Sequence, residues 1–387
     1  MTFSPPLARV RVWRFEAQRT AGRFGCALQS KTLTVFAKAS ARDALRRPVD
    51  QPPLILLNFF GIPGMSKFAS RISYRLGIFY SLVTGFLFAT QEPFSFLAAR
   101  RLNTLQFVCL TQIALLISIP LLTLHPATRR DFIALLRNPA NFGKLAVIFA
   151  IGMSGLLLYN LGLSKTHPII VSAILNLLPF WAAMVALLIS RVPIPISPTV
   201  FFGCFIVAFA GAMAVAWSQI GAAGRPTMGQ LADDFLHGGW IYAVPVPICT
   251  ALGATLIGKW FAKYQESAAI AANFFVANIV LIPATVLILY SRSELQFGGQ
   301  FAAIALMISG TIIAASAGRV LYQVALTVTG GDNGFVTMFF NLVPALTALI
   351  SLAMSWWIPA FYFAFDPMFF LGLALISASL TLFSLKS

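Results

Sequence analysis

The sequence has little charge and very few acidic residues. Only 10% of its 387 residues are Asp, Glu, Lys or Arg, whereas soluble domains carry about 25%. The four cysteines and three histidines lie far apart, so no spacing predicts a zinc site or a disulfide framework. This composition argues against a soluble globular fold, and we expect neither a metal nor a cofactor.

Motifs for catalysis are also missing from the sequence. It contains no GxxxxGK[ST] phosphate loop, so it does not indicate an ATPase. An intramembrane enzyme, such as a lipid-modifying transferase, would need acids, bases or metal ligands clustered at membrane depth. Most of the few acids lie in predicted loops, and no such set converges. We therefore predict that the protein is not an enzyme.

Long apolar runs dominate the chain instead. Hydrophobic residues make up 59% of it, and the mean hydropathy is +0.85. Apolar runs of roughly 18 or more residues predict transmembrane helices. We expect an all-α integral membrane protein with ten spans, the first interrupted at Gln91-Glu92-Pro93. The predicted spans are residues 74–97, 103–124, 143–163, 168–190, 198–217, 238–260, 267–290, 300–326, 334–357 and 367–385.

The formal net charge of +16 indicates topology rather than binding to nucleic acid. Most of the basic excess falls in loops on one side when the N-terminus is placed inside. Ten spans then return the C-terminus to the same side, so we expect both termini in the cytoplasm and the chain in a bacterial inner membrane. The segment 128–141 predicts a short surface helix, with Arg129, Arg130 and Arg137 at the headgroups.

Residues 1–64 differ from the rest because they are rich in Arg, Ser, Ala and Pro and contain few acids. Three interpretations fit this composition. The segment is an organelle-targeting peptide, a disordered basic tail near anionic lipid, or an extension ahead of a natural start at Met65. We favour the third interpretation and exclude the segment from the fold.

Two stretches of the chain repeat the same pattern. Each pairs two apolar helices and carries an amide and a proline at the same depth of the second helix. The matching residues are Tyr159 with Tyr322, Asn160 with Gln323, Asn176 with Asn341 and Pro179 with Pro344. The match divides the chain into five-helix repeats at 65–220 and 221–387. Five is odd, so the second repeat enters the membrane from the opposite side, and the halves are predicted to be inverted.

The stretches that carry this pattern are YNLGLSKTHPIIVSAILNLLPFWAAM and YQVALTVTGGDNGFVTMFFNLVPALTAL. Together with the ten-span layout, they resemble the EamA-like family of the drug/metabolite transporter (DMT) superfamily, over roughly residues 70–387. The resemblance implies a secondary transporter for small polar metabolites or amino-acid-like compounds, often working in export.

Polar residues at membrane depth are costly and usually face the bundle interior or a water-filled cavity. The candidates for lining a substrate cavity are Tyr159, Asn160, Asn176, Pro179, Arg319, Tyr322, Gln323, Asn341 and Pro344. The amide–proline pairs are alternatively packing kinks. Arg319 binds a substrate carboxylate or extends to the inner interface.

Glu92 is the acid that interrupts an apolar helix, and it has two interpretations. If it is buried, it can exchange a proton during transport. If it marks the outer end of the first span, it is an interfacial group beside Pro93, Arg100 and Arg101. We favour the interfacial interpretation and keep Glu92 as the candidate residue if transport is coupled to protons.

The leading hypothesis is an exporter of a small polar metabolite that works by alternating access of its two halves. One alternative is an organelle-type carrier for sugar phosphates or nucleotide sugars, which would need paired cations where only Arg319 is available. A more distant alternative is a non-transporting membrane sensor or scaffold. The expected partners are a small-molecule substrate, the lipid bilayer, protons and a second copy in a homodimer, but no nucleic acid.

Overall fold

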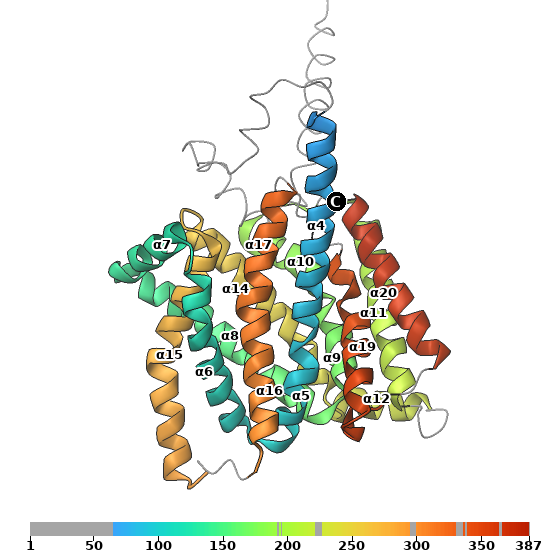
Figure 1. Cartoon of the computed structure of the whole chain (residues 1–387). Coiled ribbons are helices and arrows are strands. Elements are labelled where there is room, and N and C mark those ends of the chain that lie inside the picture. The colour runs from blue at the N-terminus through green and yellow to red at the C-terminus, as the bar shows by residue number, and fades with distance from the viewer. Residues whose placement is uncertain are drawn as a thin grey trace, which may run out of the picture.

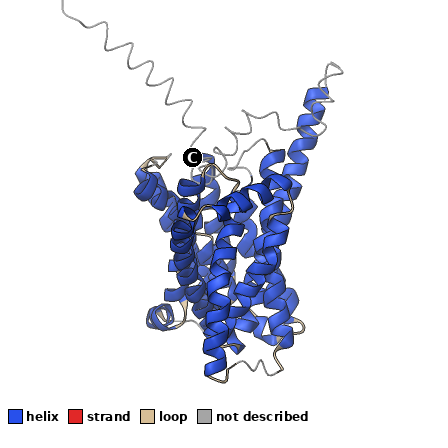
Figure 2. Cartoon of the chain, turned by 90° about the vertical axis from the view of Figure 1, so that its left-hand side faces the viewer, coloured by secondary structure: helices blue, strands red, loops and turns tan. Residues whose placement is uncertain are grey.

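The computed structural model describes residues 65–191, 193–194, 196–220, 227–294, 299–329, 336, 339–363 and 366–386. Helices dominate these ranges, within which no strand occurs (Figure 2). The predicted extension at residues 1–64 lies outside the described residues.

The helices run along a common direction as a bundle (Figure 1). They are α4 (Met65–Ala89), α5 (Gln91–Arg101), α6 (Thr104–Leu122), α7 (Pro126–Arg137), α8 (Ala140–Lys165), α9 (Pro168–Leu175), α10 (Leu178–Ser190), α11 (Pro198–Ile220), α12 (Met228–His237), α13 (Trp240–Ala243), α14 (Pro245–Phe261), α15 (Glu266–Ser291), α16 (Phe301–Ile312), the π-helix η3 (Ile313–Gly318), α17 (Arg319–Val328), the 3₁₀-helix η4 (Phe339–Leu342), α19 (Val343–Ser355), the 3₁₀-helix η5 (Pro359–Phe361) and α20 (Pro367–Lys386).

Eight helices in the described part of the chain are long and apolar enough to cross a membrane. They are Thr104–Leu122, Ala140–Lys165, Pro168–Ser190, Pro198–Gln219, Trp240–Phe261, Glu266–Ser291, Phe301–Ala325 and Pro367–Ser384. Each coincides with one of the ten predicted spans. The eight apolar helices indicate an integral membrane protein.

The other two predicted spans correspond to less continuous elements. The first, predicted at 74–97, is divided between α4 and α5. The ninth, predicted at 334–357, contains the shorter apolar helix Phe339–Ser355, and residues 334–335 and 337–338 lie outside the described ranges. Both elements are apolar, but neither is among the eight candidates.

Irregular points in the helices occur where a proline follows a polar side chain within three residues. The predicted interruption of the first span is confirmed, because α4 ends at Ala89 and α5 begins at Gln91. A second break at Asn176 and Leu177 separates α9 from α10. In the later half, the 3₁₀-helix η4 ends at Leu342 and α19 begins at the next residue, Val343, so the helix changes type there without a break.

Proline explains where the new helices start. Pro179 is the second residue of α10, and Pro344 is the second residue of α19. Proline fits the first turn of a helix because its missing N–H would have no intrahelical partner there. The amide–proline pairs therefore mark equivalent helix starts in both stretches.

The predicted surface helix near residues 128–141 is confirmed as α7. Arg129, Arg130 and Arg137 are exposed along it, whereas Leu135 is fully buried beneath. α7 also lies against the start of α15, because the backbone N–H of Gln265 donates to Asp131 Oδ2 at 3.0 Å. One face of α7 is thus basic and open, and the other holds α15 in place.

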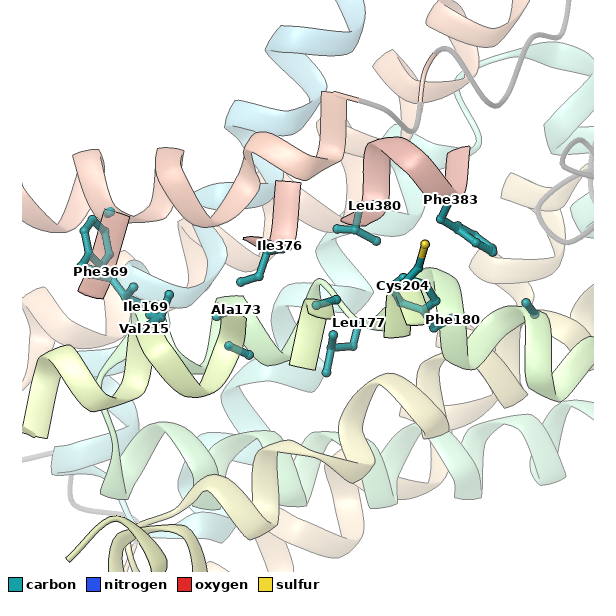
Figure 3. Packing of buried hydrophobic residues seen from close by; sticks show 14 of the residues in the cluster. Ile169, Ala173, Leu177, Phe180, Cys204, Val215, Phe369, Ile376, Leu380 and Phe383 are labelled. Atoms are coloured by element: carbon teal, nitrogen blue, oxygen red, sulfur yellow. The ribbon is translucent and has the colours of Figure 1, made fainter. Parts of the chain in front are cut away.

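The closest helix pair in the bundle is α11 with α20 (Figure 1). Gly211 and Gly372 allow this approach, because a Cβ on Gly372 would lie 2.6 Å from the Gly211 carbonyl oxygen. Small residues permit such close contact between membrane helices. Along the same helix pair, Phe180, Ile376 and Phe383 belong to a buried cluster in which the start of α10 packs against α11 and α20 (Figure 3).

Other neighbours in the bundle come from distant parts of the chain. α6 packs along α15, α8 along α14, α4 along α17, and α5 along α16. α9 packs against α19, so the helix that precedes Asn176 lies beside the helix that follows Asn341. The helices that carry the predicted site residues thus belong to one bundle.

Candidate functional site

The first group of predicted residues lies where α5 packs against α8. Tyr159 and Asn160 are consecutive residues of α8, with exposed fractions of 6% and 2%. Glu92, in the first turn of α5, lies within electrostatic range of the Tyr159 hydroxyl. The structure therefore brings Glu92 together with Tyr159, which no sequence pattern had linked.

Glu92 is enclosed by protein. Its exposed fraction is 6%, and its Oε2 atom has no hydrogen-bond partner among the described residues. A buried carboxylate without a partner is costly, so such a group takes up a proton or binds a cation more readily than a solvated one. This burial fits the proton-exchange interpretation of Glu92 better than the interfacial one.

The second group lies on α17, directly after an irregular segment. Residues Ile313–Gly318 form a π-helix, and Arg319 is the first residue of the α-helix that follows. Arg319, Tyr322 and Gln323 occupy positions i, i+3 and i+4, so they share one helix face. π-Segments inside α-helices often occur at functional sites.

Glu266 faces this group from the first residue of α15. Its Oε2 accepts a hydrogen bond from Gln323 Nε2 at 3.2 Å. Arg319 and Tyr322 both lie within electrostatic range of the same carboxylate. The second group is therefore a partly buried set of four polar residues from α15 and α17.

Glu266 is the functional candidate that the sequence reasoning missed. The predicted span began at residue 267, so this acid fell one residue outside it. The helix begins at Glu266, and acidic residues are favoured in the first turn because they complement the helix dipole. That preference could have extended the predicted span by one residue and included the acid.

The two amides that precede the starts of α10 and α19 have different surroundings. Asn341 is buried, and its Nδ2 donates to Thr381 Oγ1 at 3.3 Å. Asn176 is partly buried, and its enclosed Nδ2 finds no partner within the described ranges. Packing against α20 thus accounts for part of the Asn341 environment, whereas Asn176 retains a free donor.

A short hydrogen-bond chain links the broken helices. The hydroxyls of Ser172 on α9 and Thr347 on α19 lie 3.2 Å apart. Thr347 Oγ1 also lies 3.3 Å from the carbonyl oxygen of Ala89, the last residue of α4. Segments from α4, α9 and α19 therefore meet at one point, just before the break that leads to Glu92.

The second group also lies next to η4, the helix that contains Asn341. The ring of Tyr322 lies 5.6 Å from that of Phe340, centroid to centroid. Phe340 belongs to η4 and precedes Asn341. The α17 group is thus adjacent to the helix start that Asn341 and Pro344 define.

The histidines lie at helix ends. His167 precedes α9 and accepts a hydrogen bond from the Ile169 N–H at 3.4 Å through Nδ1. Burial lowers the pKa of His167 to about 4, so its imidazole is neutral at physiological pH. In the described part of the chain, no group of three or more His, Cys, Asp or Glu residues could hold a metal ion.

The fold and these buried polar groups define a helical integral membrane protein with polar side chains gathered inside its bundle. No protein-family model matches the chain, and no curated protein matches it. The interpretation of function therefore rests on the arrangement of the residues themselves.

Proposed function

We propose that the protein is a secondary transporter that moves a small polar metabolite or an amino-acid-like compound across the inner membrane, as an exporter. Transport would proceed by alternating access of two inverted five-helix halves, residues 65–220 and 221–387. The ten spans would be α4–α5, α6, α8, α9–α10, α11, α13–α14, α15, α16–α17, η4–α19 and α20. Both termini would lie in the cytoplasm.

The observation that carries this proposal is the recurrence of an irregular α-helix start with an amide just before it and a proline in its first turn. Asn176 with Pro179 and Asn341 with Pro344 occupy equivalent positions relative to a helix start. Irregular helix starts of this kind near the middle of a bundle are typical of binding sites in transporters. Lipid-exposed backbone could not tolerate such irregularities, which are found where protein or a polar cavity surrounds them.

The pairing of helices supports two related halves. When the ten spans are numbered in order, spans 1 to 5 form the first half and spans 6 to 10 the second. Exchanging span 1 with span 6, span 2 with span 7 and so on turns the contact between α4 and α17 into the contact between α14 and α8. The same exchange leaves the α6–α15, α11–α20 and α9–α19 pairs unchanged. All of these pairs are in contact. A transporter with interchangeable halves is expected to have this pattern.

The resemblance to the EamA-like family is consistent with this proposal. The buried Glu92 would supply proton coupling, because its carboxylate is enclosed and lies beside Tyr159. An organelle-type carrier for sugar phosphates is less well supported, because the second group holds the Glu266 carboxylate of α15 as well as its single cation, Arg319. A phosphate dianion would be repelled by that carboxylate.

The test measures export in cells. Metabolites in the medium would be compared between cells producing the parent protein and cells producing the Asn176→Ala, Asn341→Ala double variant at equal membrane abundance. The matched control is Asn278→Ala, which removes a buried amide whose Nδ2 donates to Phe274 in its own helix at 2.7 Å. We expect a compound enriched by the parent and the control but not by the double variant.

Two other outcomes would count against parts of the proposal. Equal enrichment by all three proteins would retain the transporter and make the two amides packing elements. If no compound is enriched in the medium or depleted from it, even by the parent, export and import both fail, and a non-transporting sensor or scaffold becomes the better interpretation.

A further inference from the structure

Arg319 is a cation inside the bundle that lacks a direct partner. Its side chain is partly buried, and its enclosed Nε atom has no hydrogen-bond partner among the described residues, where Arg319 also forms no ion pair. Enclosing part of a charged group without a partner is costly, because that part loses its hydration. A group that complements this charge is therefore expected, at least when the protein is working.

Glu266 is close enough to compensate the charge but does not neutralise it by direct contact. Its carboxylate interacts electrostatically with Arg319 and is held by Gln323 instead, through the 3.2 Å hydrogen bond. The preceding residue, Gln265, is fixed through its backbone N–H by Asp131 of α7. The Glu266 carboxylate is thus held by Gln323 and its backbone neighbour by α7, while Glu266 forms no direct ion pair with Arg319 among the described residues.

The geometry points to a split ion pair in which Glu266 is the resident counter-ion of Arg319 and a small anionic group is the ligand that enters between them. This inference rests on the proposed transporter function and names the class of ligand that Arg319 and Glu266 would bind. Glu266 acts through Arg319, so it is a positioning residue that limits how tightly the anion is held.

The chemistry at the site favours a singly charged group. A guanidinium fork suits a carboxylate, and a phosphate monoanion offers the same oxygen geometry. The nearby Glu266 carboxylate would oppose a second negative charge. Moderate affinity also suits transport, because a ligand bound by an unopposed buried arginine would be released slowly.

The inference predicts effects of opposite sign from two substitutions. Glu266→Gln removes the competing charge and retains a side chain of the same shape, so anion binding should tighten. Arg319→Gln removes the anion partner, so binding should be lost. A merely structural polar cluster would respond to both changes in the same direction.

The experiment uses the full chain purified in a neutral detergent. Its thermal unfolding midpoint would be titrated with pyruvate in one arm, inorganic phosphate in a second and phosphatidylglycerol in a third. The third arm distinguishes a free anion from a lipid headgroup. The matched control is Glu294→Gln, since that acid accepts a hydrogen bond from Asn103 at 2.9 Å and follows the opposite end of α15 from Glu266.

We expect pyruvate to raise the midpoint of the parent and of Glu294→Gln with similar apparent Kd values. For Glu266→Gln the apparent Kd should fall about tenfold, which corresponds to roughly 1.4 kcal/mol. Arg319→Gln should show no pyruvate-dependent shift, and Arg319→Lys provides a second variant if that protein does not fold, with binding weakened but present.

Three results would overturn the inference. They are equal pyruvate shifts in all variants, weaker binding by Glu266→Gln, and a shift produced by phosphatidylglycerol alone. The binding measurement is independent of transport. A pyruvate response without export would contradict the proposed function but retain the anion site. Export that is insensitive to Arg319→Gln would retain the proposed function but contradict the anion site.

Discussion

The α8 and α17 regions occupy equivalent places in the two proposed halves, yet their charges differ. Tyr159 and Asn160 of α8 lie beside one buried acid, Glu92, and Leu156 stands where α17 has Arg319. α17 carries a base, Arg319, and its Gln323 donates a hydrogen bond to an acid of α15, Glu266. The duplicated framework is shared, but of these two regions the second is the one with a cation beside its acid.

This difference indicates a division of labour. A lone enclosed acid is suited to binding and releasing a proton, because neutralisation relieves the cost of its burial. An acid and a base held apart are suited to binding a charged ligand. The two regions therefore suggest that coupling resides in the first half and ligand recognition in the second.

The largest expected effect comes from Glu92→Gln, which tests the first half of this comparison. Loss of the carboxylate should abolish the dependence of export on an inward proton gradient and lower its rate by about tenfold, equivalent to roughly 1.4 kcal/mol. Export of the identified compound into the medium, with and without a protonophore, measures both effects. The matched control is Asp233→Asn, because Asp233 is an exposed acid of α12.

A Glu92→Gln protein whose export still responds to the protonophore as the parent does would remove Glu92 from the coupling step. A response that is lost instead in Glu266→Gln would reverse the assigned roles of the two halves. Equal membrane abundance of all variants is needed for either conclusion.

A smaller effect is expected at the contact between α11 and α20. Gly372→Val should destabilise the protein by about 1–3 kcal/mol, the usual cost of overpacking, because its Cβ would lie 2.6 Å from the Gly211 carbonyl oxygen and 2.8 Å from Val215 N. The control is Gly203→Val on the same helix pair, where an added Cβ meets nothing within 4 Å. Thermal unfolding in detergent measures both. Similar midpoints for the two variants would contradict the close contact.

Much of the helical framework could be predicted from hydrophobic run length, because a span needs a fixed number of apolar residues. The irregular points at Glu92, Asn176 and Asn341 were also predictable, because proline removes a backbone donor and fixes the start of a new helix. Local chemistry of this kind is visible in a single sequence without knowledge of distant neighbours.

The partners across the bundle could not be predicted in the same way. Glu266 and Gln323 are far apart in the chain, and so are Ser172 and Thr347. Their contacts depend on which helix faces are turned toward each other, and hydropathy does not fix that rotation in helices that are apolar on every side. The sequence therefore predicted which residues were unusual but not which of them meet.

The smallest expected effect concerns the link between the halves. The Ser172 and Thr347 hydroxyls are 3.2 Å apart, and hydrogen bonds between membrane helices average about 0.6 kcal/mol. A double-mutant cycle of Ser172→Ala and Thr347→Val should give a coupling energy near that value in the free energy of unfolding. A cycle pairing Ser172→Ala with Ser355→Ala, whose hydroxyl donates within its own helix to Leu352 at 2.7 Å, should give none. If the first cycle also gives none, the two hydroxyls do not join α9 to α19, and packing holds this pair of helices together.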